Sequence, residues 1–416
     1  MIGLTQNTVI DSKNDWTFRS AETKQVTHGI HRYPATMIPQ VAKRLIKEYG
    51  HEGTFLFDPY CGSGTTLLEG LLAGLTSYGT DLNPLARLIA RVKSTPVNIS
   101  DLDREIKRFQ NMVPRLDIDV PEIPNIDFWF SPEIQRDLAG IRHYIGQITN
   151  MKIAEVFRVA FSLTVRNASW TRNSEFKLYR MPQLQMDKHD PQPFSNMLQS
   201  LVNIRKALRL LSQMVTDDYT RPVVYDFNTV SGIPTEKILP GSIDLVVTSP
   251  PYGDSRTTVA YGQFSRLSSQ WLGYKDASRI DSVLMGGEKI SDLPEFGFQK
   301  LDLIIHNIAK MDESRARDVA SFFQDYRNSI SNVATAITHG GYACYVVGNR
   351  TVKGYTVPTA EATAAFFENN GFRTVDICYR EIPNKQMPSV NSPSNVPGEV
   401  GQTMTKEQIT ICRKVR

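Results

Sequence analysis

The chain has 416 residues, a length that corresponds to about two or three domains, or to one large domain with insertions. Hydrophobic residues make up 41% and charged residues 22% of the sequence, and these values exclude a disordered, collagen-like or low-complexity chain. The formal net charge of +4 at pH 7 is too small to establish a nucleic-acid partner, although it is compatible with a basic groove on a mixed surface.

The sequence holds four cysteines, Cys61, Cys344, Cys378 and Cys412, and no two of them form a C-x-x-C pair. We therefore expect no structural zinc site and no disulfide framework, and the seven histidines show no metal-ligand spacing either. Isolated cysteines are typical of a reducing compartment, so we expect a cytoplasmic protein. The first residues, MIGLTQ, do not resemble a signal peptide, and no apolar run reaches about 18 residues. We expect neither export nor a membrane span.

Short apolar runs with strand character divide the chain. The first is followed by the turn Tyr60–Thr66 and a helical stretch rich in Ala, Leu and Gly, and the second leads into a helical pattern at 85–92. This alternation of strands and helices favours a parallel sheet. Helices are also predicted at 313–338 and 361–369. The seven predicted strands are 54–59, 76–80, 222–226, 243–247, 342–347, 373–380 and 408–413.

Two stretches interrupt this rhythm of strands. Residues 100–220 carry polar helical segments separated by a Pro-rich stretch at 114–132, and residues 253–310 mix aromatic, basic and Gly residues without clear periodicity. The sequence thus predicts a doubly wound α/β domain with a seven-stranded, mostly parallel sheet and two helical or irregular insertions.

The residues that follow the first two strands carry the first motif, because a parallel sheet binds its ligand beyond the carboxyl ends of its strands. Gly62 and Gly64 follow the strand that Asp58 closes, and they suit a sharp turn that approaches a ligand closely. No third Gly completes G-x-G-x-x-G, and no Gly-Lys-Ser/Thr of a phosphate-binding loop follows. Asp81 ends the next strand, where a carboxylate can accept hydrogen bonds from both hydroxyls of a ribose. The alternatives are a simple tight turn and, for Asp81, a helix cap ahead of Asn83.

The second motif is Ser249-Pro250-Pro251-Tyr252, directly after the predicted strand 243–247. Two prolines fix the backbone and remove two N–H donors, which leaves acceptors for an amino group. An exocyclic base amine is a poor nucleophile, and acceptors at Ser249 Oγ and the Pro250 carbonyl would hold its two N–H bonds for in-line attack on a methyl group. The Tyr252 ring would stack on a flipped base.

The segments Asp58–Thr65 and Thr248–Tyr252 resemble the two signatures of the DNA amino-methyltransferases. The resemblance implies a class I methyltransferase fold of the Rossmann-like kind, with S-adenosyl-L-methionine at the first motif and the target base at the second. A serine at the first position of the second motif is typical of enzymes that methylate the 4-amino group of cytosine, whereas aspartate is commoner in adenine enzymes. Ser249 therefore points to cytosine. Methylation at the ring carbon is disfavoured, because no cysteine follows a proline.

The same resemblance assigns further residues to the cofactor. The segment His31–Ala35 resembles the motif that contacts the methionine part, Asp81 matches the ribose-binding acid, and Asp226 falls where an acid meets the adenine amino group, with Phe227 as a wall. The full set of expected cofactor residues is Tyr33, Pro34, Asp58, Cys61, Gly62, Gly64, Thr65, Asp81, Asn83, Asp226 and Phe227.

The resemblance covers about 250 residues and divides the chain. We expect the catalytic domain in 1–99, 221–252 and 311–416, of which 1–99 binds the cofactor and 221–252 carries the catalytic motif. The longest insertion, 100–220, lies between the second and third strands rather than just before the catalytic strand, which departs from the usual place of a DNA-recognition region. Either 100–220 or the second insertion, 253–310, could therefore read DNA.

Basic and aromatic residues interleave around Trp170, a pattern that suits nucleic-acid binding, although a solvated helix face with core aromatics would show it too. In the second insertion, Arg256, Tyr261 and Arg266 follow the catalytic loop closely and would support a flipped base or a phosphate. The polar loop 382–398 is too long for a simple connection, so we expect DNA contact there as well. The expected DNA-binding residues are Arg172, Lys177, Arg180, Arg256, Arg266 and Lys385.

Together the motifs predict an enzyme that transfers a methyl group from S-adenosyl-L-methionine to the 4-amino group of cytosine within a specific sequence of double-stranded DNA, by base flipping and direct in-line transfer. Such an enzyme would protect its site from a cognate restriction endonuclease. The open alternatives are an adenine amino-methyltransferase, an RNA base methyltransferase and a non-catalytic DNA-binding relative, whose expected mark would be erosion of Ser249–Tyr252 or of the glycine loop. The sequence does not disclose the oligomeric state.

Overall fold

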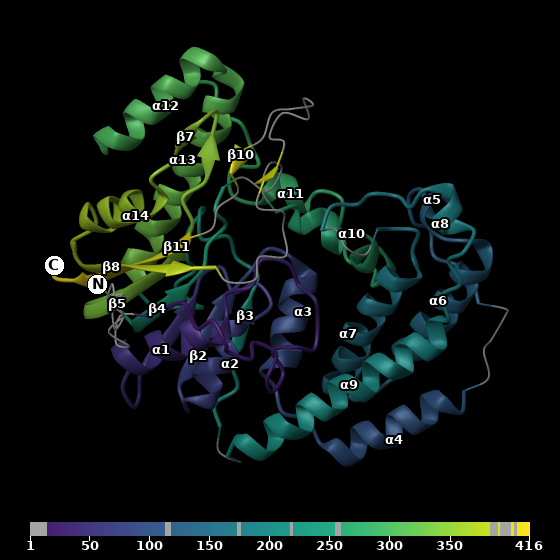
Figure 1. Cartoon of the computed structure of the whole chain (residues 1–416). Coiled ribbons are helices and arrows are strands. Elements are labelled where there is room, and N and C mark those ends of the chain that lie inside the picture. The colour runs from purple at the N-terminus through teal and green to yellow at the C-terminus, as the bar shows by residue number, and fades with distance from the viewer. Residues whose placement is uncertain are drawn as a thin grey trace, which may run out of the picture.

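The computed structural model describes residues 15–112, 118–172, 176–216, 219–253, 259–382, 390–391, 401–402 and 406–416. Figure 1 shows an α/β part built on one sheet and, beside it, a part built of helices. Two of the residues expected to bind DNA, Arg256 and Lys385, lie outside the described residues, as does most of the loop 382–398.

The main sheet has seven strands in the order β3-β2-β1-β4-β5-β11-β8. Parallel pairings join β3, β2, β1, β4 and β5, while β11 runs antiparallel to both of its neighbours. This confirms the predicted seven-stranded, mostly parallel sheet. The strands are β1 (Phe55–Asp58), β2 (Thr76–Thr80), β3 (Val223–Tyr225), β4 (Ile243–Thr248), β5 (Ile337–Val347), β8 (Phe372–Glu381) and β11 (Lys406–Lys414).

The strand order reverses between β1 and β4, and this position determines where a ligand can bind. From β1 the chain continues outward to β2 and β3 on one side, whereas β4 and β5 lie on the other. Leu56 pairs with Leu245 and Phe57 with Val246, so the two strands end side by side. The loops after β1 and β4, which carry the two motifs, therefore meet at the topological switch point of the sheet.

Helices cover both faces of the sheet, because successive residues of a buried strand point to opposite faces. Along β4, Leu245 and Val247 pack into the cluster that includes α1, while Val246 packs into the cluster that includes α13. The helices that flank the sheet are α1 (Pro39–Tyr49), α2 (Thr65–Leu72), α3 (Pro84–Lys93), α13 (Glu313–Ala336) and α14 (Thr359–Glu368).

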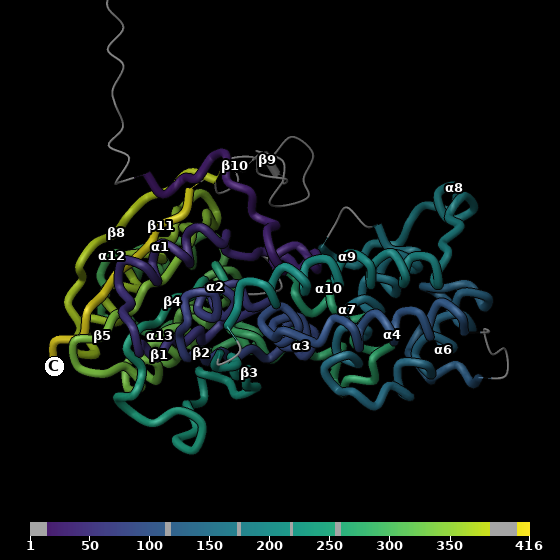
Figure 2. The backbone as a smooth tube through the Cα atoms, turned by 90° about the horizontal axis from the view of Figure 1, so that it is seen from below, coloured from purple at the N-terminus to yellow at the C-terminus, as the bar shows by residue number. Residues whose placement is uncertain are grey.

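The first insertion folds as helices around α7 (Met151–Ala168), which is buried along most of its length. Figure 2 shows these helices beside the sheet part, with α3 between the two. α7 packs against α3, α4, α6 and α9, so the insertion shares one core with the α/β part. The other insertion helices are α4 (Ile99–Gln110), α5 (Ile126–Trp129), α6 (Pro132–Gly146), α8 (Gln183–Met186) and α9 (Pro193–Met214).

The sequence showed no clear periodicity in the stretch 253–310. Its described residues, 253 and 259–310, contribute to three helices: α10 (Tyr261–Trp271), α11 (Ile280–Val283) and α12 (Gln299–Met311). α10 packs against α7 and α3, whereas α12 packs against α13. Leu301, Ile305 and Ile308 are the buried residues of α12, and their spacing of four and three residues is a helical signal that the sequence analysis missed.

β5 starts at Ile337, five residues before the predicted start. The pairing between β4 and β5 shifts register between Ile243 and Leu245, and Gly340 has a φ of +81°. A bulge-like irregularity at the two glycines thus lets the strand continue through a sequence that reads as a turn. The remaining strands form two short antiparallel pairs: β6 (Thr351–Val352) with β7 (Tyr355–Thr356), and β9 (Val390–Asn391) with β10 (Gly401–Gln402).

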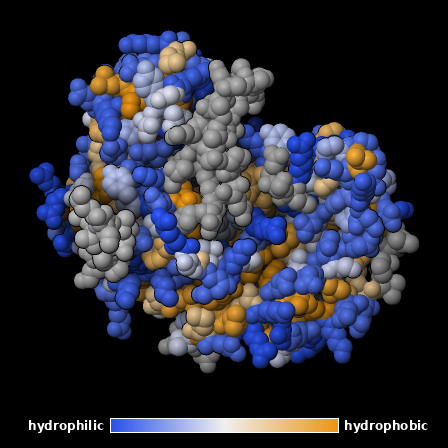
Figure 3. Space-filling model, viewed as in Figure 1, coloured by the Kyte–Doolittle hydropathy of each residue, from blue (hydrophilic) through white to orange (hydrophobic). Residues whose placement is uncertain are grey.

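The face seen in Figure 3 is largely hydrophilic, with hydrophobic residues gathered between helices in its lower half. Within the described ranges, no helix is both long enough and apolar enough to cross a membrane.

Candidate active site

A pocket lies beyond the carboxyl ends of β1, β2 and β4. About 920 Å³ of space free of protein atoms lies within it, including open solvent at its mouth. Both sequence motifs contribute to its wall. The expected site residues that line it are Tyr33, Pro34, Asp58, Cys61, Gly62, Thr65, Asp81, Asn83, Phe227, Ser249 and Pro251.

Glycine is required at positions 62 and 64 for different structural reasons. Gly62 lines the pocket with a φ of +47°, and its N–H donates to Asp81 Oδ2 at 3.0 Å. Gly64 begins α2 with a φ of +81°, and a Cβ there would lie 2.8 Å from Cα of Ala90 on α3. Gly64 is therefore needed for the turn and for the close packing of α2 against α3, and it does not line the pocket.

Asp81 ties the end of β2 to the glycine loop. In addition to the bond from Gly62, its Oδ1 accepts from the N–H of Asn83 at 2.7 Å. Burial raises the pKa of this carboxyl. Each carboxylate oxygen has two lone-pair sites, so both can still accept a bond from a ligand. The helix cap considered for Asp81 is instead Asn83, whose Oδ1 accepts from the N–H of Leu85 at 3.1 Å.

Asn83 also connects the pocket to residues far away in the sequence. Its Nδ2 donates to the hydroxyl of Tyr33 at 3.1 Å and to Ser265 Oγ on α10 at 3.0 Å. The Tyr33 ring stacks on Tyr261, with centroids 6.1 Å apart, and meets the edge of Phe264. Tyr261 therefore forms one wall of the pocket. Its place beside Tyr33 was not predicted, because no local pattern places α10 beside residue 33.

Asp58 is the first residue of the first motif, and its side chain contacts the second motif. Its Oδ1 accepts from Thr248 Oγ1 at 2.5 Å and from the N–H of Tyr60 at 3.1 Å. Burial raises the pKa of Asp58 to about 6, although these hydrogen bonds oppose the shift. The bond to Thr248 joins the end of β1 to the residue that precedes Ser249.

The structure separates the residues of the catalytic motif. Ser249 and Pro251 line the pocket, whereas Pro250 and Tyr252 do not. The Tyr252 hydroxyl is 3.2 Å from Ser249 Oγ and donates to Oε1 of Glu407 at 2.8 Å. Burial raises the pKa of Tyr252 well above its ordinary value, so the phenol is neutral. The stacking of this ring on a base stays a prediction.

After β3, residues that follow Asp226 line the pocket, and Asp226 itself does not. Asp226 is exposed and does not line the pocket, whereas Phe227 and Asn228 do. Thr80 Oγ1 donates to the carbonyl of Phe227 at 2.7 Å, which turns the chain toward β2 immediately after Asp226. The proposed contact of Asp226 with an adenine amino group stays a prediction, and Asn228 is a polar neighbour that the sequence analysis missed.

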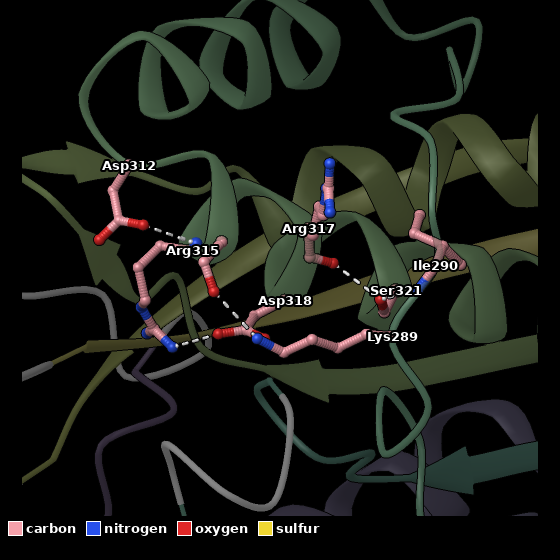
Figure 4. A network of polar contacts seen from close by, with 8 residues as sticks. Lys289, Ile290, Asp312, Arg315, Arg317, Asp318 and Ser321 are labelled. Atoms are coloured by element: carbon pink, nitrogen blue, oxygen red, sulfur yellow. Dashed lines mark hydrogen bonds and ion pairs between the residues drawn. The ribbon is translucent and has the colours of Figure 1, made fainter.

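The segment that contains Leu284 and Met285 forms another wall of the pocket. Gly286 N–H donates to Asp325 Oδ2 at 2.8 Å, and Figure 4 shows how the following residues are held on α13. Ile290 N–H donates to Ser321 Oγ at 3.0 Å. The network also includes the ion pairs of Asp318 with Lys289 and with Arg315, both at 2.8 Å. These contacts fix a wall that lies far from both motifs in the sequence.

Three of the expected DNA-binding residues lie together. The stretches on either side of 173–175 pair, since the Arg172 N–H donates to the Tyr179 carbonyl at 2.9 Å. The Arg180 guanidinium lies over the rings of Phe128 and Trp170. Lys177 belongs to the same stretch, and Arg266 is on α10. The contact between Phe176 and Phe264 of α10, with centroids 6.1 Å apart, places this surface next to the pocket wall.

A buried amine supports the glycine loop from behind. Lys93, which is 3% exposed, donates from Nζ to Ser63 Oγ at 3.1 Å, and Ser63 lines the pocket. Burial lowers the pKa of Lys93 to about 7. His28 and Glu69 form a buried pair nearby, 2.7 Å apart. Within the expected motif His31–Ala35, His31 is half-buried and its Nε2 lies 3.1 Å from Ser162 Oγ. Desolvation of its imidazole lowers the pKa of His31 to about 3.

We expect Lys93→Met to stabilise the protein at pH 7 and to reduce the pH dependence of its stability. Between the folded pKa of about 7 and the unfolded pKa of about 10.4, only the unfolded chain binds the proton. The free energy of unfolding therefore rises with pH in this window, by at most about 1.4 kcal/mol per pH unit. Urea unfolding at pH 7, 8 and 9 checks this, with exposed Lys206→Met as control. Equal slopes for Lys93→Met and wild type would contradict it.

A doubly wound seven-stranded sheet with an antiparallel β11 and a ligand pocket at its β1/β4 switch point has the architecture of a class I methyltransferase. The family model described as DNA methylase matches residues 6–91. The type II methyltransferase M.MvaI of Kocuria varians is 36% identical over 422 residues, which cover 95% of this chain and 93% of that protein. The chain belongs to the DNA amino-methyltransferase family and is a DNA methyltransferase of the restriction–modification type.

Weaker similarities are found as well. The type II methyltransferase M.BsoBI of Geobacillus stearothermophilus is 23% identical over 258 residues, covering 56% of this chain and 50% of that protein. The rRNA methyltransferase aviRa of Streptomyces viridochromogenes matches with a TM-score of 0.32 and 11% identity, covering 92% of this chain and 88% of its own. A putative DNA modification methylase of Thermus thermophilus, complexed with S-adenosyl-L-methionine, gives 0.21 and 16%, with coverages of 45% and 52%. The family assignment rests on the sequence relatives.

The cofactor of this family is S-adenosyl-L-methionine, and the chemistry of the pocket fits it. The wall presents the half-buried carboxylate of Asp81, a backbone without a side chain at Gly62 and a flat ring at Phe227. When bound, this cofactor supplies an electrophilic methyl group.

Proposed function

We propose that this protein methylates the 4-amino group of cytosine within a specific sequence of double-stranded DNA. The observation that carries the proposal is that Ser249 and Pro251 line the same pocket as Asp81 and Gly62. A target amine held at Ser249 would thus lie in one chamber with the cofactor. The serine at the first position of the catalytic motif supports cytosine as the base.

The proposed chemistry needs acceptors more than it needs a base. The lone pair of an exocyclic amine is delocalised into its ring. Hydrogen bonds from its N–H groups to Ser249 Oγ and to the Pro250 carbonyl would localise that lone pair and aim it at the methyl group. Reaching the pocket requires that the base leave the duplex stack, so the proposal includes base flipping.

We also propose roles for the pocket residues in holding the cofactor. Asp81 would accept hydrogen bonds from the ribose hydroxyls, and the Tyr33–Pro34 segment would lie along the methionine part. Phe227 would form a wall for the adenine ring. The remaining lining residues, Asp58, Cys61, Thr65 and Asn83, would shape the chamber between the two ends.

The test is product analysis. Purified protein is incubated with mixed-sequence duplex DNA and labelled S-adenosyl-L-methionine, and the DNA is digested to nucleosides for mass analysis. We expect N(4)-methylcytosine. Methyladenine would keep the mechanism and overturn the base assignment. Transfer to RNA alone, or no transfer at all, would overturn the proposal and favour an RNA enzyme or a non-catalytic relative.

For DNA contact we propose the surface formed by Arg172, Lys177, Arg180 and Arg266, which joins the first insertion to α10. Exposed Phe176 and Tyr179 accompany these basic residues, and such interleaving suits a nucleic-acid backbone with unstacked bases. On this proposal both insertions, 100–220 and 253–310, take part in reading DNA. A cognate restriction endonuclease with the same recognition sequence completes the proposed system.

We expect Lys177→Ala to weaken DNA binding by a few-fold at low salt and to make the salt dependence shallower by about one unit of slope, because one phosphate contact is lost. Fluorescence anisotropy at salt concentrations from about 50 to 200 mM, a range over which phosphate contacts weaken strongly, measures the affinity and its salt dependence. Lys206→Ala removes an exposed lysine from α9 and is the matched control. Identical slopes for Lys177→Ala and Lys206→Ala would remove this surface from the proposal.

A further inference from the structure

The hydroxyl of Tyr252 belongs to a chain of hydrogen bonds that leads away from the pocket. It lies 3.2 Å from Ser249 Oγ and donates to Oε1 of Glu407 at 2.8 Å. Glu407 is on β11, 155 residues further along the chain. The proposed chemistry gives Glu407 no role, although its carboxylate is the acceptor for a tyrosine of the catalytic motif.

The carboxylate of Glu407 is itself held in place. Arg380 on β8 lies directly opposite Glu407 in the β11–β8 pairing, and its Nη1 forms an ion pair with Glu407 Oε2. The side chains of Arg380 and Glu407 are 4% and 14% exposed, so water screens the pair little. Arg380 Nε also donates to the carbonyl of Trp16 at 3.2 Å. Two strands and the N-terminal segment thus fix the position of Glu407.

An anchored hydroxyl restricts the tyrosine ring. The ring of Tyr252 turns about two side-chain bonds, and a hydrogen bond from its hydroxyl to a fixed acceptor selects one orientation. Ser249 Oγ contacts the same hydroxyl, so the serine that lines the pocket is oriented by the same contact. A site whose groups are oriented before the substrate arrives loses less conformational entropy on binding.

We propose that Glu407 is a positioning residue of the methyl-transfer site, which holds the ring of Tyr252 and, through its hydroxyl, the side chain of Ser249. Arg380 fixes Glu407 in turn. The proposal rests on the proposed function, since it concerns the site that receives the target base. Glu407 acts only through Tyr252, so its loss should lower kcat and leave the KM for the cofactor nearly unchanged.

The experiment is a double-mutant cycle with duplex DNA and labelled S-adenosyl-L-methionine. We expect Tyr252→Phe and Glu407→Ala each to lower kcat by about tenfold. The double variant should be no slower than the slower single variant, because both changes remove the same interaction. Glu381→Gln is the control, since Glu381 belongs to β8 and forms an exposed ion pair with Arg19. We expect wild-type kcat for it.

Glu407→Ala leaves the buried Arg380 guanidinium without a counter-charge and can unfold the chain, so thermal unfolding of each variant is measured beside the kinetics. Tyr252→Phe keeps the ion pair between Arg380 and Glu407, so this variant tests the proposal alone if Glu407→Ala does not fold. An unchanged kcat for Tyr252→Phe overturns the proposal, and so do two effects that multiply in the double variant. A wild-type chain that methylates no base overturns the proposed function as well, whereas an active wild type with an equally active Tyr252→Phe overturns only the role of Glu407.

Discussion

Tyr252→Ala is expected to reduce methyl transfer by about 100-fold or more while cofactor binding stays nearly intact. The change removes the proposed stacking surface and the hydrogen bond to Glu407. A small misplacement of reacting groups is enough for a loss of this order. Tyr252 does not line the pocket that fits the cofactor. Single-turnover transfer of labelled methyl groups and calorimetric titration with S-adenosyl-L-methionine measure the two effects separately.

The matched control is Tyr379→Ala, which removes an exposed tyrosine from β8 without touching the pocket. We expect wild-type transfer for that variant. If Tyr252→Ala weakened cofactor binding in parallel with transfer, Tyr252 would belong to the cofactor side of the site, and the proposed stacking on the base would be wrong.

Asp81→Ala is expected to show the opposite order of effects, with cofactor affinity lowered by about 10- to 100-fold. The net loss of one hydrogen bond to a charged group costs about 1.5–3 kcal/mol, which corresponds to this range, and the loss of two would exceed it. The substitution removes the proposed ribose acceptor and also frees the N–H groups of Gly62 and Asn83, which the carboxylate now holds. Calorimetry gives the affinity, and kcat at saturating cofactor shows how much of the transfer step survives.

Asp119→Ala is the control, because Asp119 is an exposed acid of the first insertion that does not line the pocket. Asp81→Asn separates the two roles of Asp81, since an amide keeps an acceptor for one backbone N–H and loses the charge. Wild-type activity of Asp81→Ala at ordinary cofactor concentration would leave Asp81 with a structural role alone.

Local sequence was enough to predict the strands and the loops that follow them. The buried run 243–247, for example, is followed closely by Pro250 and Pro251. Proline cannot donate the backbone hydrogen bond that the interior of a sheet requires, so the prolines mark the end of the strand in the sequence. Helix α12 was missed, because its three buried positions occur among polar residues in a stretch without other signals. The start of β5 was misplaced, because Gly340 and Gly341 read as a turn and only pairing with β4 continues the strand across them.

The sequence by itself determined the class of fold, the two motifs and the expectation that both lie at one edge of a parallel sheet. Only the tertiary structure decided which side chains meet there. It placed Tyr261 and Met285 in the wall, left Asp226 exposed beside the lining Asn228, and joined Tyr252 to Glu407. The physical reason is that strand ends and turns follow from local sterics, whereas these contacts depend on how α10, α13 and β11 pack against distant strands.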